Sequence, residues 1–267
     1  MTMLHNTAAH ARTQLSRINS ALENAGLDTI PAPDTTTVPT ITAPTATEVA
    51  EAVLAAKDPS TDKKVQALAT RAWLAQNSGV KNLADERWMA AWDRFRTEQG
   101  PALLETIRDR YREAGEHLSA AATGPLREYG SLAQLDLGSL PTALAHEAAE
   151  TISHYRHAVA LHQAWVSVCA GLAGQGRKSH WAEQGNPTLE QYRAAANSAP
   201  QTFPKNDAWS IVRKGWQLEL AESFVHVGER RNALREQDQA IDEGARKKDI
   251  TKSLAGGGFI VGPNSNR

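Results

Sequence analysis

Apolar residues recur every three or four positions through most of this 267-residue chain, a spacing that places them on one face of an α-helix. No long stretch shows the strict alternation of a half-buried strand bounded by hairpin turns. The pattern predicts a first helix over residues 3–25, ended by Gly26. It predicts further helices over residues 48–57, 59–78, 83–99, 102–122, 140–172, 187–198 and 207–254. The expected fold is therefore all-α.

Residues 27–46 interrupt this pattern with four prolines among many threonines. Proline cannot donate a backbone hydrogen bond and fixes its own φ, so a helix is excluded here. We expect an extended, flexible linker with polyproline character. Residues 1–26 then form an N-terminal helix that is tethered to the rest of the chain and need not pack on it.

Residues 47–204 are expected to form the helical body. Asp58, followed by Pro59 at the first helical position, is a predicted helix cap. Gly100-Pro101 predicts that one helix stops and another begins. Beyond it, apolar residues step alternately by three and four from Leu104 to Ala121, which is the spacing of a coiled-coil seam. The expectation is an elongated helical bundle with coiled-coil character.

Residues 205–254 predict one long C-terminal helix, followed by a flexible tail over residues 255–267. A helix from Asp207 to Leu254 would be roughly 70 Å long and would extend beyond a domain of this size. Leu234 and Ile241 would then remain exposed in a monomer and serve as interaction residues. The alternative is a helix broken at Gly228 or Gly244, with its end folded back.

Composition narrows the classes of protein and partner. The chain has 29 basic and 30 acidic residues, so its net charge gives no general attraction to nucleic acid. The single cysteine, Cys169, excludes an internal disulfide and a cysteine-based zinc site. The longest apolar run, residues 158–174, is short for a membrane span and contains His162. We expect no membrane insertion, and a location in the cytoplasm or within an assembled particle.

Histidine and glutamate are concentrated in "HEAAETISHYRH", residues 146–157. On a helix with 100° per residue, His146, Glu150, His154 and His157 fall within an arc of roughly 80°. These side chains could converge on one metal ion. We expect them instead to share one exposed or interfacial helix face, because Glu and His four residues apart also stabilise a helix as surface neighbours and the apolar residues of this segment lie on the opposite face.

The same four-residue spacing recurs at Glu113/His117 and at Glu222/His226. Carboxylate-bridged metal sites in helical bundles use a different motif, Glu-x-x-His, so the pattern departs from that class. No other cofactor motif is present, and no cofactor is expected.

The loop of residues 173–187 contains basic residues and an aromatic one in a polar context. Its glycines do not match a phosphate-binding P-loop, because Arg177 stands between the last glycine and Lys178. Arg177 and Trp181 are interaction candidates; Trp181 is equally well explained as an anchor that holds the loop on the body. Core-like helical spacing predicts burial for five other tryptophans: Trp73, Trp88, Trp92, Trp209 and Trp216.

Long helices, a linker and two loose ends are typical of proteins that assemble with others. The sequence therefore predicts a non-enzymatic structural or adaptor protein, such as a component of a bacteriophage virion, that forms homo-oligomers or binds a protein partner through its long helices. The first alternative is a helical-bundle metalloenzyme that uses the Glu/His clusters. The second is a nucleic-acid-binding regulator, which needs a basic surface that the sequence does not display.

Overall fold

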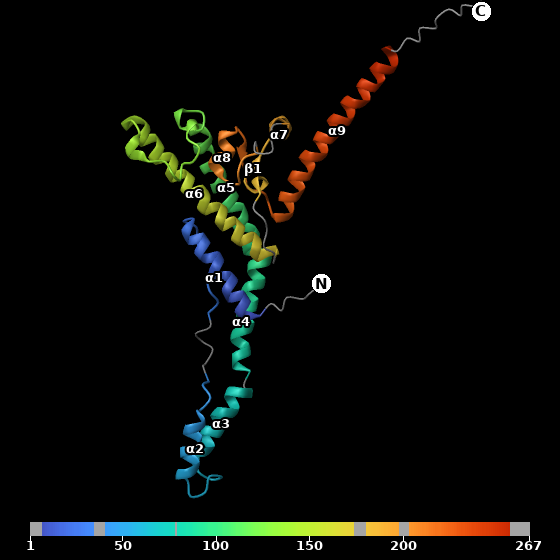
Figure 1. Ribbon diagram of the computed structural model, residues 1–267. Coiled ribbons are helices and arrows are strands. Elements are labelled where there is room, and N and C mark those ends of the chain that lie inside the picture. Colours follow the sequence, from blue (N-terminus) through green and yellow to red (C-terminus); the bar gives the residue numbers. More distant parts are fainter. Residues whose placement is uncertain (1–6, 35–40, 78, 174–179, 198–202, 257–267) are drawn as a thin grey trace, which may run out of the picture. The chain divides into compact units, whose positions relative to one another are not determined.

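The computed structural model describes residues 7–34, 41–77, 79–173, 180–197 and 203–256, without the side chains of residues 77, 80, 81 and 249–256 (Figure 1). The described chain is mostly helical, as the sequence predicts. The chain is divided into two compact units, Met1–Leu103 and Leu104–Arg267. Among the helices of the described residues, none is both long and apolar enough to cross a membrane.

The first unit contains α1 (Ala8–Asn24), α2 (Ala46–Ala55), α3 (Lys63–Asn77), α4 (Val80–Arg94) and the π-helical segment η1 (Phe95–Gln99). Thr7 caps α1 by accepting a hydrogen bond from the His10 amide. Gly26 follows the helix with φ of +66°, a conformation that glycine adopts without a steric penalty. The apolar face of α1 is buried, and α1 packs against α4 rather than remaining only tethered.

The described parts of the Pro/Thr-rich segment, residues 27–34 and 41–45, are non-helical as predicted. They are not free of the helices, however. The Asn19 side chain hydrogen-bonds both the amide and the carbonyl of Ile30, each at 2.8 Å, and Ile30 is buried. Arg87 donates to the carbonyl of Asp34 at 2.7 Å. The first part of the expected flexible linker is therefore fixed against the helices of its own unit.

The cap of α3 differs from the one expected, whereas α2 has a complete capping box. Thr45 caps α2, and the Glu48 carboxylate accepts from the Thr45 amide, which completes a capping box. Asp58 hydrogen-bonds Ser60 in a turn and caps no helix. Asp62 caps α3, because its carboxylate accepts from the amides of residues 64 and 65.

The predicted break at Gly100-Pro101 is wrong, because η1 leads directly into α5 (Gly100–Ala121). Proline in a helix lacks an N–H group and its ring clashes with the carbonyl four residues earlier. Here the preceding residues take the wider π-helical form, in which the Gly100 amide donates to the carbonyl of Phe95. The helix thus passes the proline without ending.

The second unit contains most of α5 and the long helices α6 (Thr142–Ala173) and α9 (Phe224–Gly256). Between them lie the 3₁₀ segments η2 (Pro125–Glu128), η3 (Leu137–Ser139) and η4 (Trp181–Glu183), and the short helices α7 (Leu189–Ala196) and α8 (Ala208–Arg213). The predicted seam of α5 is buried at Leu104, Ile107, Tyr111, Ala114 and Leu118. Its three-four spacing thus identified a core face.

The expected C-terminal helix is interrupted near its beginning by a short strand, β2 (Gln217–Leu218), which belongs to an antiparallel pair. β1 (Gly185–Asn186) pairs with β2, with Gly185 opposite Leu218. Helix α8 ends at Arg213, and the chain then turns through Gly215, which has φ of +75°. The prediction of one helix from Asp207 to Leu254 is therefore wrong. The break lies at Gly215, whereas α9 runs without interruption through Gly228 and Gly244.

The tryptophans divide between core and surface. Trp92, Trp209 and Trp216 are buried and Trp88 is half-buried, whereas Trp73 is 61% exposed and contradicts the expectation that it lies in the core. Trp181 is buried and stacks on Phe203, with a ring-centroid distance of 5.9 Å, and it meets Trp216 edge to face at 5.1 Å. The loop after α6 is thus anchored in an aromatic cluster.

Candidate functional site

The histidine-rich face predicted from residues 146–157 lies on α6. His146, Glu150 and His157 are exposed, and His154 is half-buried. The segment is helical, and its apolar residues Ala148 and Ile152 are buried. This arrangement is the exposed or interfacial helix face that the periodicity predicts.

The half-buried His154 stacks on His117 of α5. Their ring centroids are 4.0 Å apart and the ring planes differ by 9°. Burial lowers the pKa of His154, and the neighbouring His117 and His157 lower it further, while Glu150 raises it. The sequence displays the two Glu/His spacings separately, but it does not indicate that their histidines meet.

The stacked rings do not form a metal site as they stand. The lone pairs of imidazole nitrogens lie in the ring plane, so two parallel rings direct them side by side rather than toward one point. Within the described residues, no group of three or more His, Cys, Asp or Glu side chains is arranged to hold a metal ion. The geometry instead brings two titratable rings into contact across a helix–helix packing surface.

A buried chain of hydrogen bonds joins α5 to α6 in the second unit. The Tyr111 hydroxyl donates to Gln184 Oε1 at 2.6 Å, and Gln184 Nε2 donates to Asn206 Oδ1 at 2.8 Å. Asn206 Nδ2 donates to Glu183 Oε2 at 2.8 Å, and that oxygen lies 3.1 Å from His162 Nε2.

Burial raises the pKa of Tyr111 well above its ordinary range, so its hydroxyl remains a donor. Glu183 and Gln184 are almost fully buried. Sequence reasoning missed this network, because its members come from two helices and two loops that no local pattern connects. Its polar atoms bond one another, which is the arrangement that buried polar side chains need for stability.

The base of α9 is fixed to the second unit through Arg230, which is only 8% exposed. Its guanidinium donates to the carbonyls of Gly185 and Glu219 at 3.2 and 2.9 Å, and it lies 3.5 Å from the Glu219 carboxylate. Burial lowers the pKa of Arg230 and the Glu219 carboxylate raises it. The first turns of α9 therefore have one fixed position on the β1–β2 pair.

A second contact supports α9 two turns further along. Arg193 of α7 bonds Asp238 and Asp242 at 2.8 and 2.7 Å. Leu234 lies between the two supports and is half-buried, while Ile241 is 43% exposed. From residue 239 to residue 248 all side chains are exposed, apart from the half-exposed position at Gly244. The outer part of α9 is thus a mostly exposed helical surface of the second unit.

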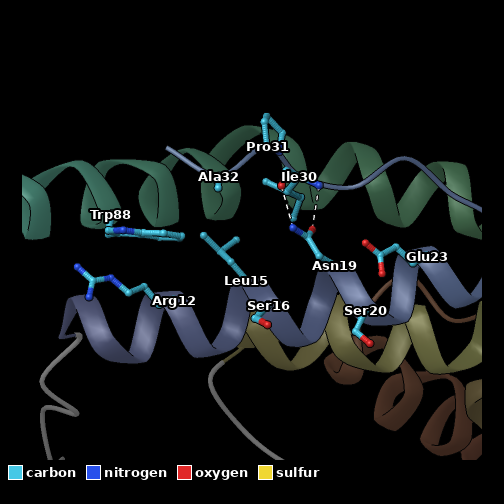
Figure 2. A pocket seen from close by; sticks show the side chains of 10 residues that line it. All are labelled: Arg12, Leu15, Ser16, Asn19, Ser20, Glu23, Ile30, Pro31, Ala32 and Trp88. Carbon is cyan, nitrogen blue, oxygen red and sulfur yellow. Dashed lines mark hydrogen bonds between the residues drawn. The ribbon is translucent and has the colours of Figure 1, made fainter. Parts of the chain in front are cut away.

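The first unit has a pocket of about 310 Å³ beside α1 (Figure 2). Figure 2 shows the ring of Trp88 over the Arg12 guanidinium and Asn19 facing Ile30. Arg12 is also paired with Asp85 at 2.9 Å. These polar groups already hold the chain's own extended segment and the neighbouring helix, so the pocket serves the fold of the first unit.

The two loop residues predicted as interaction candidates have different outcomes. Trp181 is buried in the aromatic cluster, which favours the anchor alternative. Arg177 lies outside the described residues. Comparison with known proteins gives no further guide, because no family model, curated protein or solved structure matches the chain.

Proposed function

We propose that the protein is a non-enzymatic assembly component that self-associates through the outer part of α9. The observation that carries the proposal is the contrast along this one helix. Its base is fixed by the buried Arg230 and by the Arg193 ion pairs with Asp238 and Asp242, whereas the side chains described beyond Asp242, as far as residue 248, are exposed apart from the half-exposed position at Gly244.

The length of α9 supports this role. A helix of 33 residues spans about 50 Å. Because the base of α9 is already fixed, its outer end loses little conformational entropy when it binds another helix. Val227, Leu234 and Ile241 follow one another at seven-residue intervals, and their exposure rises along the helix from buried to 43%. A seven-residue repeat of apolar residues is the spacing that pairs one helix with another.

The residues beside this repeat are charged. Arg231 and Asp238 lie three or four residues from the apolar positions and so beside them on the helix surface. A paired α9 would bury Leu234 and Ile241, while these opposite charges set the register. The pairing is expected to be a short coiled coil, because a lysine occupies the next seven-residue position at Lys248.

The first unit adds a separate apolar surface. Leu54 of α2 is 85% exposed and Trp73 of α3 is 61% exposed. Large exposed apolar side chains on a folded unit are typical of protein contact surfaces. A chain with two such surfaces suits an assembled particle, for which the virion of a bacterial virus is one example.

The test is the solution mass of the wild-type chain and of Leu234→Lys/Ile241→Lys. The wild type should exceed its monomer mass of 28.9 kDa at high concentration, and the double variant should remain monomeric with unchanged helical circular dichroism. Asn232→Lys/Gln239→Lys is the matched control, because it adds the same charges at the same spacing on exposed positions away from the apolar repeat. A monomeric wild type, or equal dissociation of both variants, contradicts the proposal.

A further inference from the structure

A second hollow, of about 380 Å³, lies in the second unit where the end of α5, the η2 segment and the turn after α8 meet. Two arginines line it, Arg127 and Arg213, and no acidic residue does. In the described part of the chain neither guanidinium forms an ion pair. Two unneutralised guanidinium groups at one concave site are unusual for a purely structural surface, because like charges repel each other.

The position of Arg213 is fixed before any ligand binds. Its Nε donates to the backbone carbonyl of Arg127 at 2.7 Å. A guanidinium has five N–H donors in a planar fork, so four remain for another acceptor. Such a preset fork matches the oxygens of a phosphate or carboxylate group, and presetting reduces the entropic cost of binding.

The rim of the hollow is also fixed. The Gly215 amide bonds back to the Val212 carbonyl of α8, and the Gly215 carbonyl accepts from Gln191 Nε2 at 2.7 Å. The side chains of Ser119 and Gln217 add neutral polar groups to the lining.

Two elements oppose an anion, namely the C-terminal ends of α5 and α8, which are the negative ends of the helix dipoles. Their effect is reduced because the last carbonyls already accept hydrogen bonds: those of Ala120 and Ala121 from the amides of Thr123 and Gly124, and that of Val212 from the Gly215 amide. The guanidinium charges are full charges, whereas a helix end carries about half of one. The hollow therefore retains a net attraction for anions.

The hollow has an apolar side formed by Ala122, Val212 and Trp216. A phosphate group alone is too small to fill about 380 Å³, since a water molecule occupies only about 30 Å³ in the liquid. An organic group attached to the phosphate would cover this apolar side and displace water from it.

We propose that this hollow binds a small organic phosphate monoester, with Arg127 and Arg213 holding the phosphate and the Ala122–Val212–Trp216 side contacting the organic group. The charge decides between phosphate and carboxylate. A phosphate monoester carries about −1.5 to −2 at pH 7 and matches two guanidinium groups, whereas a carboxylate carries −1. The proposal is independent of self-association through α9, because the two sites use different residues.

The experiment is calorimetric titration of the full chain with phenyl phosphate, inorganic phosphate and benzoate at low salt. Phenyl phosphate should bind at one site, more tightly than inorganic phosphate or benzoate. Arg127→Gln and Arg213→Gln should each weaken it by at least about tenfold, which corresponds to about 1.4 kcal/mol. Arg127→Gln retains the backbone carbonyl that positions Arg213, so it is informative even if Arg213→Gln disturbs the turn.

Lys214→Gln is the matched control, because it removes the same charge from the adjacent residue, which does not line the hollow. It should change the affinity less than about twofold, with circular dichroism confirming that all variants fold. Equal losses for all three variants would show general charge attraction and overturn the site. Absence of saturable binding by about 10 mM, or tighter binding of benzoate than of phenyl phosphate, would also overturn it.

Discussion

The imidazole rings of His117 and His154 lie face to face, 4.0 Å apart between centroids, although 37 residues separate them in the chain. One ring belongs to α5 and the other to α6, so their protonation bears directly on the packing of these helices. Two protonated imidazoles at this distance would repel each other, and this repulsion is absent when either ring is neutral.

Stability should therefore fall as the pH drops through 6.5, the ordinary pKa of histidine. Burial, and then His117, lower the pKa of His154 in the folded state. As the pH falls, the unfolded chain therefore binds the proton first, which favours the unfolded state and lowers the free energy of unfolding. This loss of stability is absent well above pH 6.5 and complete below the lowered pKa of the folded state. Denaturant midpoints measured between about pH 7.5 and about pH 5.5 should show the loss, and His154→Gln should reduce it.

The matched control is His157→Gln, which removes an exposed histidine from the same helix and should retain most of the pH dependence. If His154→Gln has the same pH profile as the wild type, the stacked pair does not control stability in this range.

Arg230→Ala should destabilise the second unit by about 3 kcal/mol, because it leaves buried carbonyls and the Glu219 carboxylate without their donor. Arg231→Ala removes the same charge from the next, exposed position and should change the free energy of unfolding by no more than about 0.5 kcal/mol. Chemical denaturation of both variants measures the difference. Equal effects would show that the burial of Arg230 has no energetic consequence.

Asn19→Ala should release the extended segment of the first unit. The variant loses both hydrogen bonds to Ile30, so the free energy of local opening of this segment should fall by about 1–3 kcal/mol. Hydrogen exchange at the Ile30 amide should be slow in the wild type and faster in the variant. Ser20→Ala, at a neighbouring position lining the same pocket, should leave that exchange unchanged. Rapid exchange in the wild type would contradict the described contact.

Two glycine-to-alanine changes should have opposite signs. At Gly115 an added Cβ would stand 2.9 Å from the Cβ of Leu218, so Gly115→Ala should destabilise by about 1–3 kcal/mol through overpacking. At Gly228 nothing lies within 4 Å, so Gly228→Ala should stabilise α9 by up to about 1 kcal/mol through helix propensity. Thermal unfolding of the two variants tests both, and a shift of the same sign for each would contradict this account.

The sequence by itself determined the helical class, the buried face of α5 and the non-helical character of residues 27–34. Each depends on interactions between neighbours in the chain. Ile107, Tyr111 and Leu118 recur with the helical period, so any helix there presents them together for burial. Proline excludes a helix through its own ring, whatever the rest of the chain does.

Only the tertiary structure decided where the helix predicted from Asp207 ends and which side chains meet. The apolar spacing from Trp209 to Leu220 fits a continuous helix, but β2 pairs with β1, and Leu218 is buried against the body through that pairing. The contacts between His117 and His154, and between Asn206 and Glu183, join residues distant in the sequence. Such contacts arise from the packing of whole elements, so no local pattern of residues contains them.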